Sequence, residues 1–253
     1  MSININKLIF DLGFHNGDDT DYYLKKGFSV VAVEANPTLI EEGKARFKNE
    51  IEEGRLILYH RAFSLTSNYE TTFHIHPTNS DWSSCDANRV NWDGSIPIQV
   101  TVKTICLTDL YLHGCPYYIK TDIEGKDVIM VQDLLQHINC MQPSFVSFEL
   151  SKRDYYEVFS YLHVAGYNRF QLVNQRNNDG RLDETINYSF SKYSSGMFGE
   201  WLPKERWMTT DQTWTHYMKY KELKVIDNQE LALGWVDLHA AFKEVIENGM
   251  SNL

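Results

Sequence analysis

The chain has 253 residues, of which 43% are hydrophobic and 23% are charged, proportions typical of a globular protein with a substantial core. Acidic residues outnumber lysine and arginine by 34 to 24, and no basic cluster occurs, which argues against a nucleic-acid partner because phosphates are bound by lysine and arginine. No window approaches the roughly 18 consecutive apolar residues of a membrane span.

Apolar runs alternate with helical patterns through the first two thirds of the chain. Six runs predict strands, at residues 8–12, 29–34, 56–62, 117–122, 145–149 and 169–173. Helices are predicted from Asp18, as the cap, to Lys26, from Pro37 to about Asn49, and over 126–138. This alternation predicts a parallel sheet with helices on both faces.

Two segments interrupt the alternation. Within residues 70–105, two candidate strands at 71–75 and 96–104 flank a polar loop, which predicts an inserted hairpin. The segment 174–215 is rich in Asn, Ser, Gly and aromatic residues. Uncovered loops of this length are uncommon, and Trp201, Trp207 and Trp214 favour a packed lid.

A glycine-rich stretch follows the first predicted strand. It reads Asp11-Leu-Gly-Phe-His-Asn-Gly17, and the second strand ends in Glu34. In nucleotide-binding βαβ units, glycines let the backbone approach a ligand, and an acid at the end of the second strand binds ribose hydroxyls. The unit predicts a ligand with an adenosine-like sugar, the alternative for Glu34 being an ordinary strand end.

Three aspartates open the helix after this loop, at positions 18, 19 and 21. A pyrophosphate prefers a helix N-terminus without carboxylates, and the loop lacks the G-x-G-x-x-G spacing. Both features argue against an oxidoreductase that uses NAD or FAD. They suit a ligand with cationic groups and no phosphate, such as S-adenosylmethionine, unless the acids only cap the helix.

Carboxylates also end two later strands. Asp122 and Glu124 lie in Tyr117-Tyr-Ile-Lys-Thr-Asp-Ile-Glu-Gly125, and Glu149 ends the fifth strand. Because the carboxyl ends of parallel strands share one edge of the sheet, we expect one site there. Asp122, Glu124, Glu149 and His15 are candidate general bases. The three carboxylates could also bind a divalent metal, which the sequence leaves open but does not favour.

Three motifs, in this order and at this spacing, resemble those of the FkbM-type methyltransferases, a family of class I S-adenosylmethionine-dependent enzymes. They are Phe10-Asp-Leu-Gly-Phe-His-Asn-Gly-Asp-Asp-Thr20, Val33-Glu-Ala-Asn-Pro37 and Ile119-Lys-Thr-Asp-Ile-Glu-Gly125. The resemblance covers roughly residues 7 to 200. It implies a Rossmann-like α/β fold whose seven-stranded sheet is mostly parallel, with one antiparallel edge strand.

The resemblance further implies methyl transfer, commonly to a hydroxyl of a sugar or natural product, with S-adenosylhomocysteine as the second product. Carried over by position, the residues that would contact the cofactor are Asp11, Gly13, Asn16, Gly17, Thr20, Glu34, Asn36, Arg61, Ala62 and Asp122. The family commonly has a small residue at the position of His15, which could therefore narrow the cofactor pocket or reach the substrate.

We expect one methyltransferase domain over residues 1–253, with the insertion at about 70–105 and an acceptor-side lid at about 174–215. The expected acceptor is a sugar or nucleotide-sugar hydroxyl. An N-methyltransferase acting on a small molecule and a non-catalytic cofactor-binding module are the alternatives. The start of the chain lacks a basic segment followed by a long apolar core, and the four cysteines form no C-x-x-C pair, so we expect a cytoplasmic protein.

Overall fold

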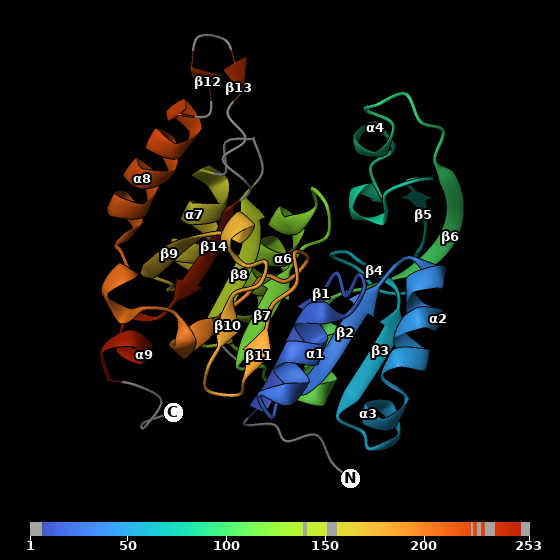
Figure 1. Ribbon diagram of the computed structural model, residues 1–253, viewed down its shortest axis with the longest axis horizontal. Helices are drawn as coiled ribbons and strands as arrows, with labels where there is room; N and C mark the ends of the chain where they lie inside the picture. Colours follow the sequence, from blue (N-terminus) through green and yellow to red (C-terminus); the bar gives the residue numbers. More distant parts are fainter. Residues whose placement is uncertain are drawn as a thin grey trace. The chain divides into compact units, whose positions relative to one another are not determined.

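The computed structural model describes residues 7–138, 141–150, 156–223, 225–226, 229–230 and 236–248. The chain divides into two compact units, Met1–Pro143 and Ser144–Leu253. The main sheet has seven strands, in the order β3 (Leu56–His60), β2 (Ser29–Glu34), β1 (Leu8–Leu12), β7 (Tyr118–Thr121), β8 (Phe145–Leu150), β14 (Val236–Ala241) and β9 (Arg169–Asn174) (Figure 1). The predicted seven-stranded, mostly parallel α/β architecture is confirmed.

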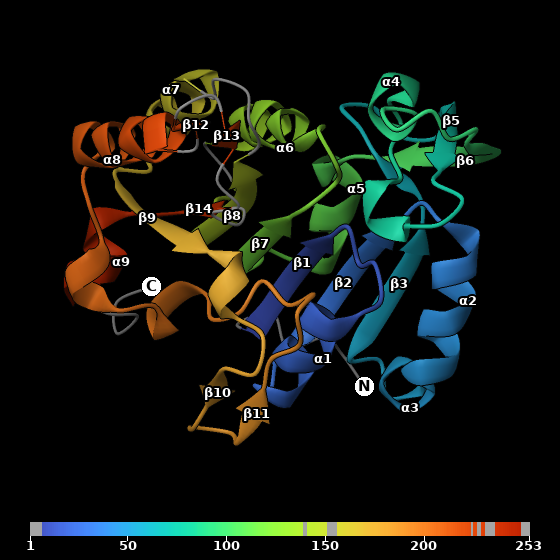
Figure 2. The same cartoon turned by 45° about the horizontal axis from the view of Figure 1, so that its top comes forward.

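The first unit is built around β1. This strand pairs in parallel with β2 and with β7, and β3 pairs in parallel with β2. Every residue of β1 and β2 is buried, as expected for parallel strands covered on both faces. Helices α1 (Asp18–Lys25), α2 (Pro37–Arg46) and α3 (Lys48–Glu52) pack against β1–β3 (Figure 1 and Figure 2). The carboxyl ends of these strands therefore lead into the loops that carry the predicted site residues.

Two helix boundaries differ from the prediction. Gly17, with φ of 81°, occupies the N-cap of α1, and Asp18 is the first helical residue. The helix predicted from Pro37 to about Asn49 breaks at Phe47, where φ is −108° and ψ is 29°. The buried ring of Phe47 packs edge-on against Phe14 at this break, so tertiary packing divides the segment into α2 and α3.

The strand predicted over 56–62 ends early. The N–H of Arg61 donates to the carbonyls of Glu34 (2.9 Å) and Tyr59 (3.1 Å), and the chain leaves β2 there. β4 (Ala62–Phe63) pairs instead with β6 (Ile98–Ile105), which pairs antiparallel with β5 (Glu70–Ile75). The inserted hairpin is thus confirmed, and β4 makes it a three-stranded sheet.

The loop between β5 and β6 contains two short helices, η2 (Ser80–Trp82) and α4 (Ala87–Val90). Figure 1 shows this part of the insertion beyond the carboxyl ends of β1, β2 and β3. The remaining elements of the first unit are α5 (Leu107–Leu110), η3 (Tyr111–His113), α6 (Asp127–Leu134) and η4 (Leu135–His137). The helix predicted over 126–138 corresponds to α6 and η4.

In the second unit, β14 pairs antiparallel with both β8 and β9. The antiparallel strand is therefore internal, and the expectation of an antiparallel edge strand is wrong. An antiparallel strand needs no crossover helix, so the returning chain can pair between two parallel neighbours. The helices of this unit are α7 (Tyr156–Val164), α8 (Thr210–Leu223), which packs against β9, and α9 (Lys243–Asn248).

The aromatic-rich segment 174–215 is largely irregular. After α8, outside this segment, β12 (Val225–Ile226) pairs with β13 (Gln229–Glu230). The segment itself contains η5 (Gln175–Asn177), the paired strands β10 (Leu182–Asp183) and β11 (Tyr188–Ser189), η6 (Gly199–Trp201) and η7 (Lys204–Arg206). Its tryptophans contact Phe198, Phe145 and Phe159 of the same unit. Among the described residues, no helix combines the length and apolarity that a bilayer crossing requires.

Candidate functional site

The glycine loop after β1 is held between two strand ends. The N–H groups of Gly13 and Phe14 both donate to the carbonyl of Val33, at 3.0 and 3.1 Å. On the other side, a Cβ added at Gly13 would lie 1.8 Å from the carbonyl oxygen of Asp122, and φ at Gly13 is +93°. Only glycine permits this approach of the β1 and β7 loops.

Asn16 and Gly17 shape the start of α1. The side-chain oxygen of Asn16 accepts from the N–H of Asp18, and its amide donates to the Asp18 carboxylate, each at 3.0 Å. Arg46 donates to the Asn16 carbonyl at 2.8 Å and to the Asp18 carboxylate at 2.7 Å. A Cβ at Gly17 would approach the rings of Phe14 and Phe47 to 2.6 Å. Asn16 therefore satisfies the N–H of Asp18, the first donor of the helix.

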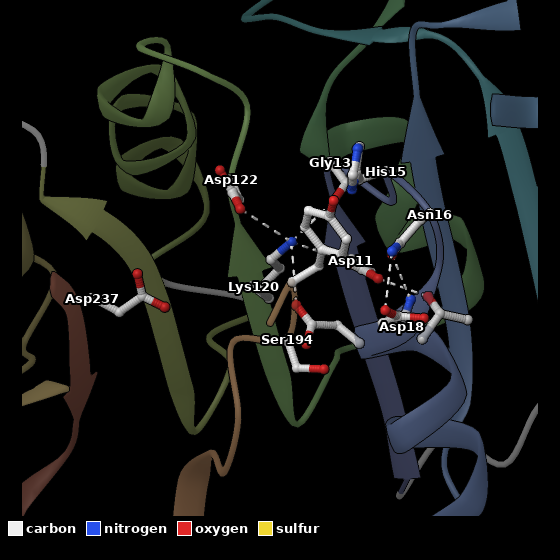
Figure 3. A network of polar contacts seen from close by, with 12 residues as sticks. Asp11, Gly13, His15, Asn16, Asp18, Lys120, Asp122, Ser194 and Asp237 are labelled. Atoms are coloured by element: carbon white, nitrogen blue, oxygen red, sulfur yellow. Dashed lines mark hydrogen bonds and ion pairs between the residues drawn. The ribbon is translucent and has the colours of Figure 1, made fainter. Parts of the chain in front are cut away.

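A buried cluster of charges lies beside this loop (Figure 3). The ammonium of Lys120 on β7 lies 3.6 Å from Asp11, 3.5 Å from Asp19 and 3.6 Å from Asp122, measured to carboxylate oxygens. It also donates to the Gly13 carbonyl at 3.0 Å, and Thr20 donates to Asp11 at 2.6 Å. Three acids thus surround one base.

Burial raises the pKa of the Asp11 carboxyl to about 6, and the opposing effect of Lys120 only partly offsets it. Asp122 differs from Asp11 in access, because its side chain is 41% exposed whereas that of Asp11 is fully buried. The cluster therefore presents one accessible carboxylate in front of a buried one.

Glu34, at the end of β2, has a carboxylate fixed from two sides. One oxygen accepts from the N–H of His15 and the other from the N–H of Asn36, both at 2.8 Å. Asn36 caps α2 by accepting from Thr38 at 3.0 Å. Arg61 and Ala62 follow β3 nearby, since the Arg61 N–H donates to the Glu34 carbonyl. The predicted ribose-binding acid and its neighbours thus form one rigid corner.

His15 connects this corner to the insertion. Its φ is +50°, and its Nε2 lies 2.9 Å from both the Ser80 hydroxyl and the Asp81 carboxylate of η2. Burial lowers the pKa of the His15 imidazole, but the hydrogen bond and charge of Asp81, with the charge of Glu34, outweigh it and raise that pKa. Asp81 therefore favours the protonated form of His15.

The loop after β7 is braced by the insertion and by α6. The Glu124 carboxylate forms an ion pair with Arg89, whose Nε donates to it at 3.0 Å. The backbone carbonyl of Glu124 accepts from the Ser84 hydroxyl at 2.8 Å. The Ile123 N–H donates to Asp127 at 3.2 Å. Burial, reinforced by the charge of Asp122, raises the pKa of Asp127 to about 7. The Arg89 guanidinium therefore pairs with the Glu124 carboxylate.

Glu149, the remaining predicted acid, lies on β8 of the second unit, where Asp237 is its partner in register. In the same unit a chain of polar contacts supports the segment around Ser194: Asn178 donates to the Ser194 carbonyl at 3.0 Å and to Gln175 at 3.1 Å, and Gln175 binds Asp237. These contacts give the aromatic-rich segment a fixed local structure.

The first unit thus brings together most of the predicted site residues, namely Asp11, Gly13, Asn16, Gly17, Thr20, Glu34, Asn36, Arg61, Ala62, Asp122, Glu124 and His15. The sequence reasoning missed Lys120, Asp81 and Arg89. Lys120 could have been found, because a lysine within an otherwise apolar strand indicates a buried, paired charge. Asp81 and Arg89 lie in a polar loop with no local pattern that distinguishes them.

The sequence profile of the methyltransferase FkbM domain matches residues 11–169. No curated protein matches the chain. Similar solved structures include precorrin-6y C5,15-methyltransferase from Geobacter metallireducens, 11% identical over 69% of each chain, with a TM-score of 0.37. A putative methyltransferase from Thermoplasma acidophilum is 12% identical over 96% of this chain and 70% of its own, with a TM-score of 0.40.

A third structure, phosphoethanolamine N-methyltransferase 2 from Haemonchus contortus in complex with S-adenosyl-L-methionine, is 10% identical over 96% of this chain and 49% of its own, with a TM-score of 0.40. At this distance none of the three assigns a role to a residue. The matched profile, in contrast, spans more than half of the sequence, from Asp11 through the Glu34 corner and the Asp122 loop to β9. The chain belongs to the methyltransferase FkbM domain family.

Proposed function

We propose that this protein transfers the methyl group of S-adenosylmethionine to a hydroxyl of a sugar-like acceptor. The fixed carboxylate of Glu34 carries the proposal. Each of its oxygens accepts one backbone N–H at 2.8 Å, which leaves a further lone-pair direction on each for a hydroxyl donor. Two adjacent acceptors of this kind suit a vicinal diol such as that of ribose.

The charges beside the glycine loop fit the other end of this cofactor. S-adenosylmethionine carries a sulfonium and an ammonium, and three carboxylates with one lysine form a site with excess negative charge. Gly13 lets the glycine loop pack against the backbone carbonyl of Asp122, which keeps the acids of the two loops close together. The residues present therefore fit a cationic nucleoside better than a pyrophosphate.

The bound cofactor supplies an electrophilic methyl carbon, and the chain has to align the acceptor oxygen and receive its proton. Asp122 is our candidate base because its carboxylate is the accessible member of the cluster. Arg89 neutralises Glu124, and the raised pKa of His15 favours a protonated donor over a base. His15 would then contact an acceptor or cofactor oxygen.

We also propose that Glu149 and the segment 174–215 contribute to acceptor binding within a single functional domain. Aromatic side chains of this segment, such as Tyr193 at 46% exposure, offer stacking surfaces for sugar rings. This scheme does not use a divalent metal, and one oxygen of the Glu124 carboxylate pairs with Arg89.

Calorimetric titration with S-adenosylhomocysteine tests the cofactor assignment. Glu34→Ala and Asp11→Ala should each weaken binding by more than about tenfold, because each removes a charged partner of the ligand or of its loop. Glu42→Ala, at an exposed position of α2, is the matched control and should bind as the parent does. Unchanged affinity in both site variants would remove the assignment.

The acceptor is tested by incubating the protein and S-adenosylmethionine with a panel of sugars, nucleotide-sugars and small amines. Mass spectrometry and NMR should locate the new methyl group on a sugar oxygen, with turnover maintained in EDTA. A product methylated on nitrogen would support the alternative acceptor class. Cofactor binding without turnover on any acceptor would support a non-catalytic module.

A further inference from the structure

Lys120 is the one charged residue of β7 and is 4% exposed. An ammonium in such surroundings is costly unless charges and hydrogen bonds compensate it. Its compensation comes from separate elements: Asp11 on β1, Asp19 on α1 and Asp122 after β7, all within 3.6 Å. Lys120 therefore joins three elements that converge on the predicted cofactor loop.

The hydrogen bond from Lys120 to the Gly13 carbonyl, at 3.0 Å, adds a direct link to that loop. The opposite side of the loop is held by the Val33 carbonyl through the N–H groups of Gly13 and Phe14. Lys120 thus supplies a side-chain contact that holds the loop from the β7 side. Figure 3 shows its ammonium between Asp122 and the side chain of Asp11, close to Gly13.

The same ammonium limits the negative charge of the cluster. Without it, the negative charges of Asp11, Asp19 and Asp122 would repel one another. With it, the buried acids are partly neutralised while Asp122 remains 41% exposed. A cationic ligand then meets the accessible carboxylate of Asp122, which the buried ammonium of Lys120 holds in position.

We propose that Lys120 is a positioning residue for methyl transfer, which holds the Gly13 carbonyl and the Asp11 and Asp122 carboxylates in the arrangement that binds the cationic end of the cofactor. This inference rests on the proposed function. It adds a residue that contacts neither acceptor nor reacting carbon and acts through the loop and the acids.

The charges around Asp11 give the test its direction. Asp11 faces Asp19, Thr20 and Tyr23 of α1, together with Lys120 and Asp122. Lys120 lowers the pKa of Asp11, whereas Asp122 raises it. We expect cofactor binding to be lost as the pH falls and Asp11 takes up a proton. Removing the lysine should therefore raise the pH midpoint of this loss, and removing the Asp122 charge should lower it.

The experiment measures the affinity of the full chain for S-adenosylhomocysteine between pH 5 and 8 in Lys120→Met, Lys120→Arg and Asp122→Asn. Lys120→Met should weaken binding roughly tenfold or more and move the midpoint upward, and Lys120→Arg should restore much of the affinity by keeping the charge. Asp122→Asn should move the midpoint downward. Lys44→Met, at an exposed position of α2, is the control.

Two results would overturn the inference. One is a Lys120→Met protein that binds with the parent's affinity and midpoint. The other is Asp122→Asn shifting the midpoint upward or not at all, which remains decisive even if Lys120→Met does not fold. A parent protein that fails to bind S-adenosylhomocysteine would instead remove the proposed function, and the inference with it. If the parent binds S-adenosylhomocysteine and the variants behave as the parent does, the inference about Lys120 is wrong while the proposed function stands.

Discussion

At the scale of single residues, two glycines with similar backbones show what the site demands. Gly13 and Gly94 have φ of +93° and +85°, but a Cβ at Gly13 would lie 1.8 Å from the Asp122 carbonyl oxygen, whereas none of the described atoms lies within 4 Å of a Cβ at Gly94. The left-handed conformation alone costs an alanine about 1–2 kcal/mol. The additional clash at Gly13 belongs to the contact between the two loops.

Gly13→Ala should therefore lower the free energy of unfolding by at least about 2 kcal/mol more than Gly94→Ala does. Urea unfolding of both variants measures the difference. Equal losses would show that the β1 and β7 loops can separate at little cost, and would contradict the close approach on which the site depends.

Glu34 makes the complementary point about polar groups. Its carboxylate is oriented by two backbone donors before any ligand arrives. A preorganised acceptor loses no side-chain freedom on binding, so more of its interaction energy appears as affinity. We therefore propose that Glu34 contributes strongly to the affinity for the ligand.

At the scale of elements, the insertion is joined to the glycine loop through η2. Ser80 and Asp81 bind the imidazole of His15, while the backbone N–H of His15 binds Glu34. One residue therefore contacts both the insertion and the acid of the second strand. The arrangement couples the position of η2 to the corner that we propose binds ribose.

Asp81→Asn should lower the pKa of His15, because it removes the charge that raises the pKa and leaves the burial that lowers it. NMR titration of the His15 ring protons measures this value. Asp86→Asn, which changes a cap of α4 in the same insertion, should leave it unaltered. An unshifted or higher pKa in Asp81→Asn would contradict the ion pair.

At the scale of the whole molecule, buried carboxyls link stability to pH. The folded-state pKa of Asp127 is about 7, compared with 3.8 as the ordinary value. The folded chain therefore holds a proton that the unfolded chain releases. This contribution stabilises the fold fully below about pH 4 and is lost as the pH rises through about 7. Asp11, with a pKa of about 6, acts in the same direction.

Between pH 5 and pH 8, the free energy of unfolding should therefore fall less in Asp127→Asn than in the parent. The difference should be on the order of 2 kcal/mol, because the amide has no such proton to release. The Asn side-chain oxygen can still accept from Ile123, as Asp127 does at 3.2 Å. Urea unfolding at the two pH values checks this. Asp179→Asn, at an exposed position, is the control and should lose as much stability as the parent does. If Asp127→Asn also loses as much as the parent, Asp127 does not hold a buried proton.

The order of strands and helices was predictable because its signs are local. β1 and β2 have the predicted limits, since a run of three to four apolar residues forms the centre or start of each strand and turn residues follow it. β14 was not located in advance, because Asp237 and His239 interrupt its apolar pattern and both are buried by neighbours that the sequence does not reveal. Asp18 was assigned as the cap, whereas Gly17 occupies the N-cap and the preceding Asn16 accepts from the Asp18 N–H across the turn.

The sequence by itself determined that acids would stand at the ends of parallel strands beside a glycine loop, since strand periodicity and glycine turns are properties of neighbouring residues. Only the tertiary structure decided which charges meet. Lys120 contacts Gly13 across 107 positions, and His15 contacts Ser80 across 65. Such pairs form when the chain closes long loops to bury its core, and no local pattern specifies them.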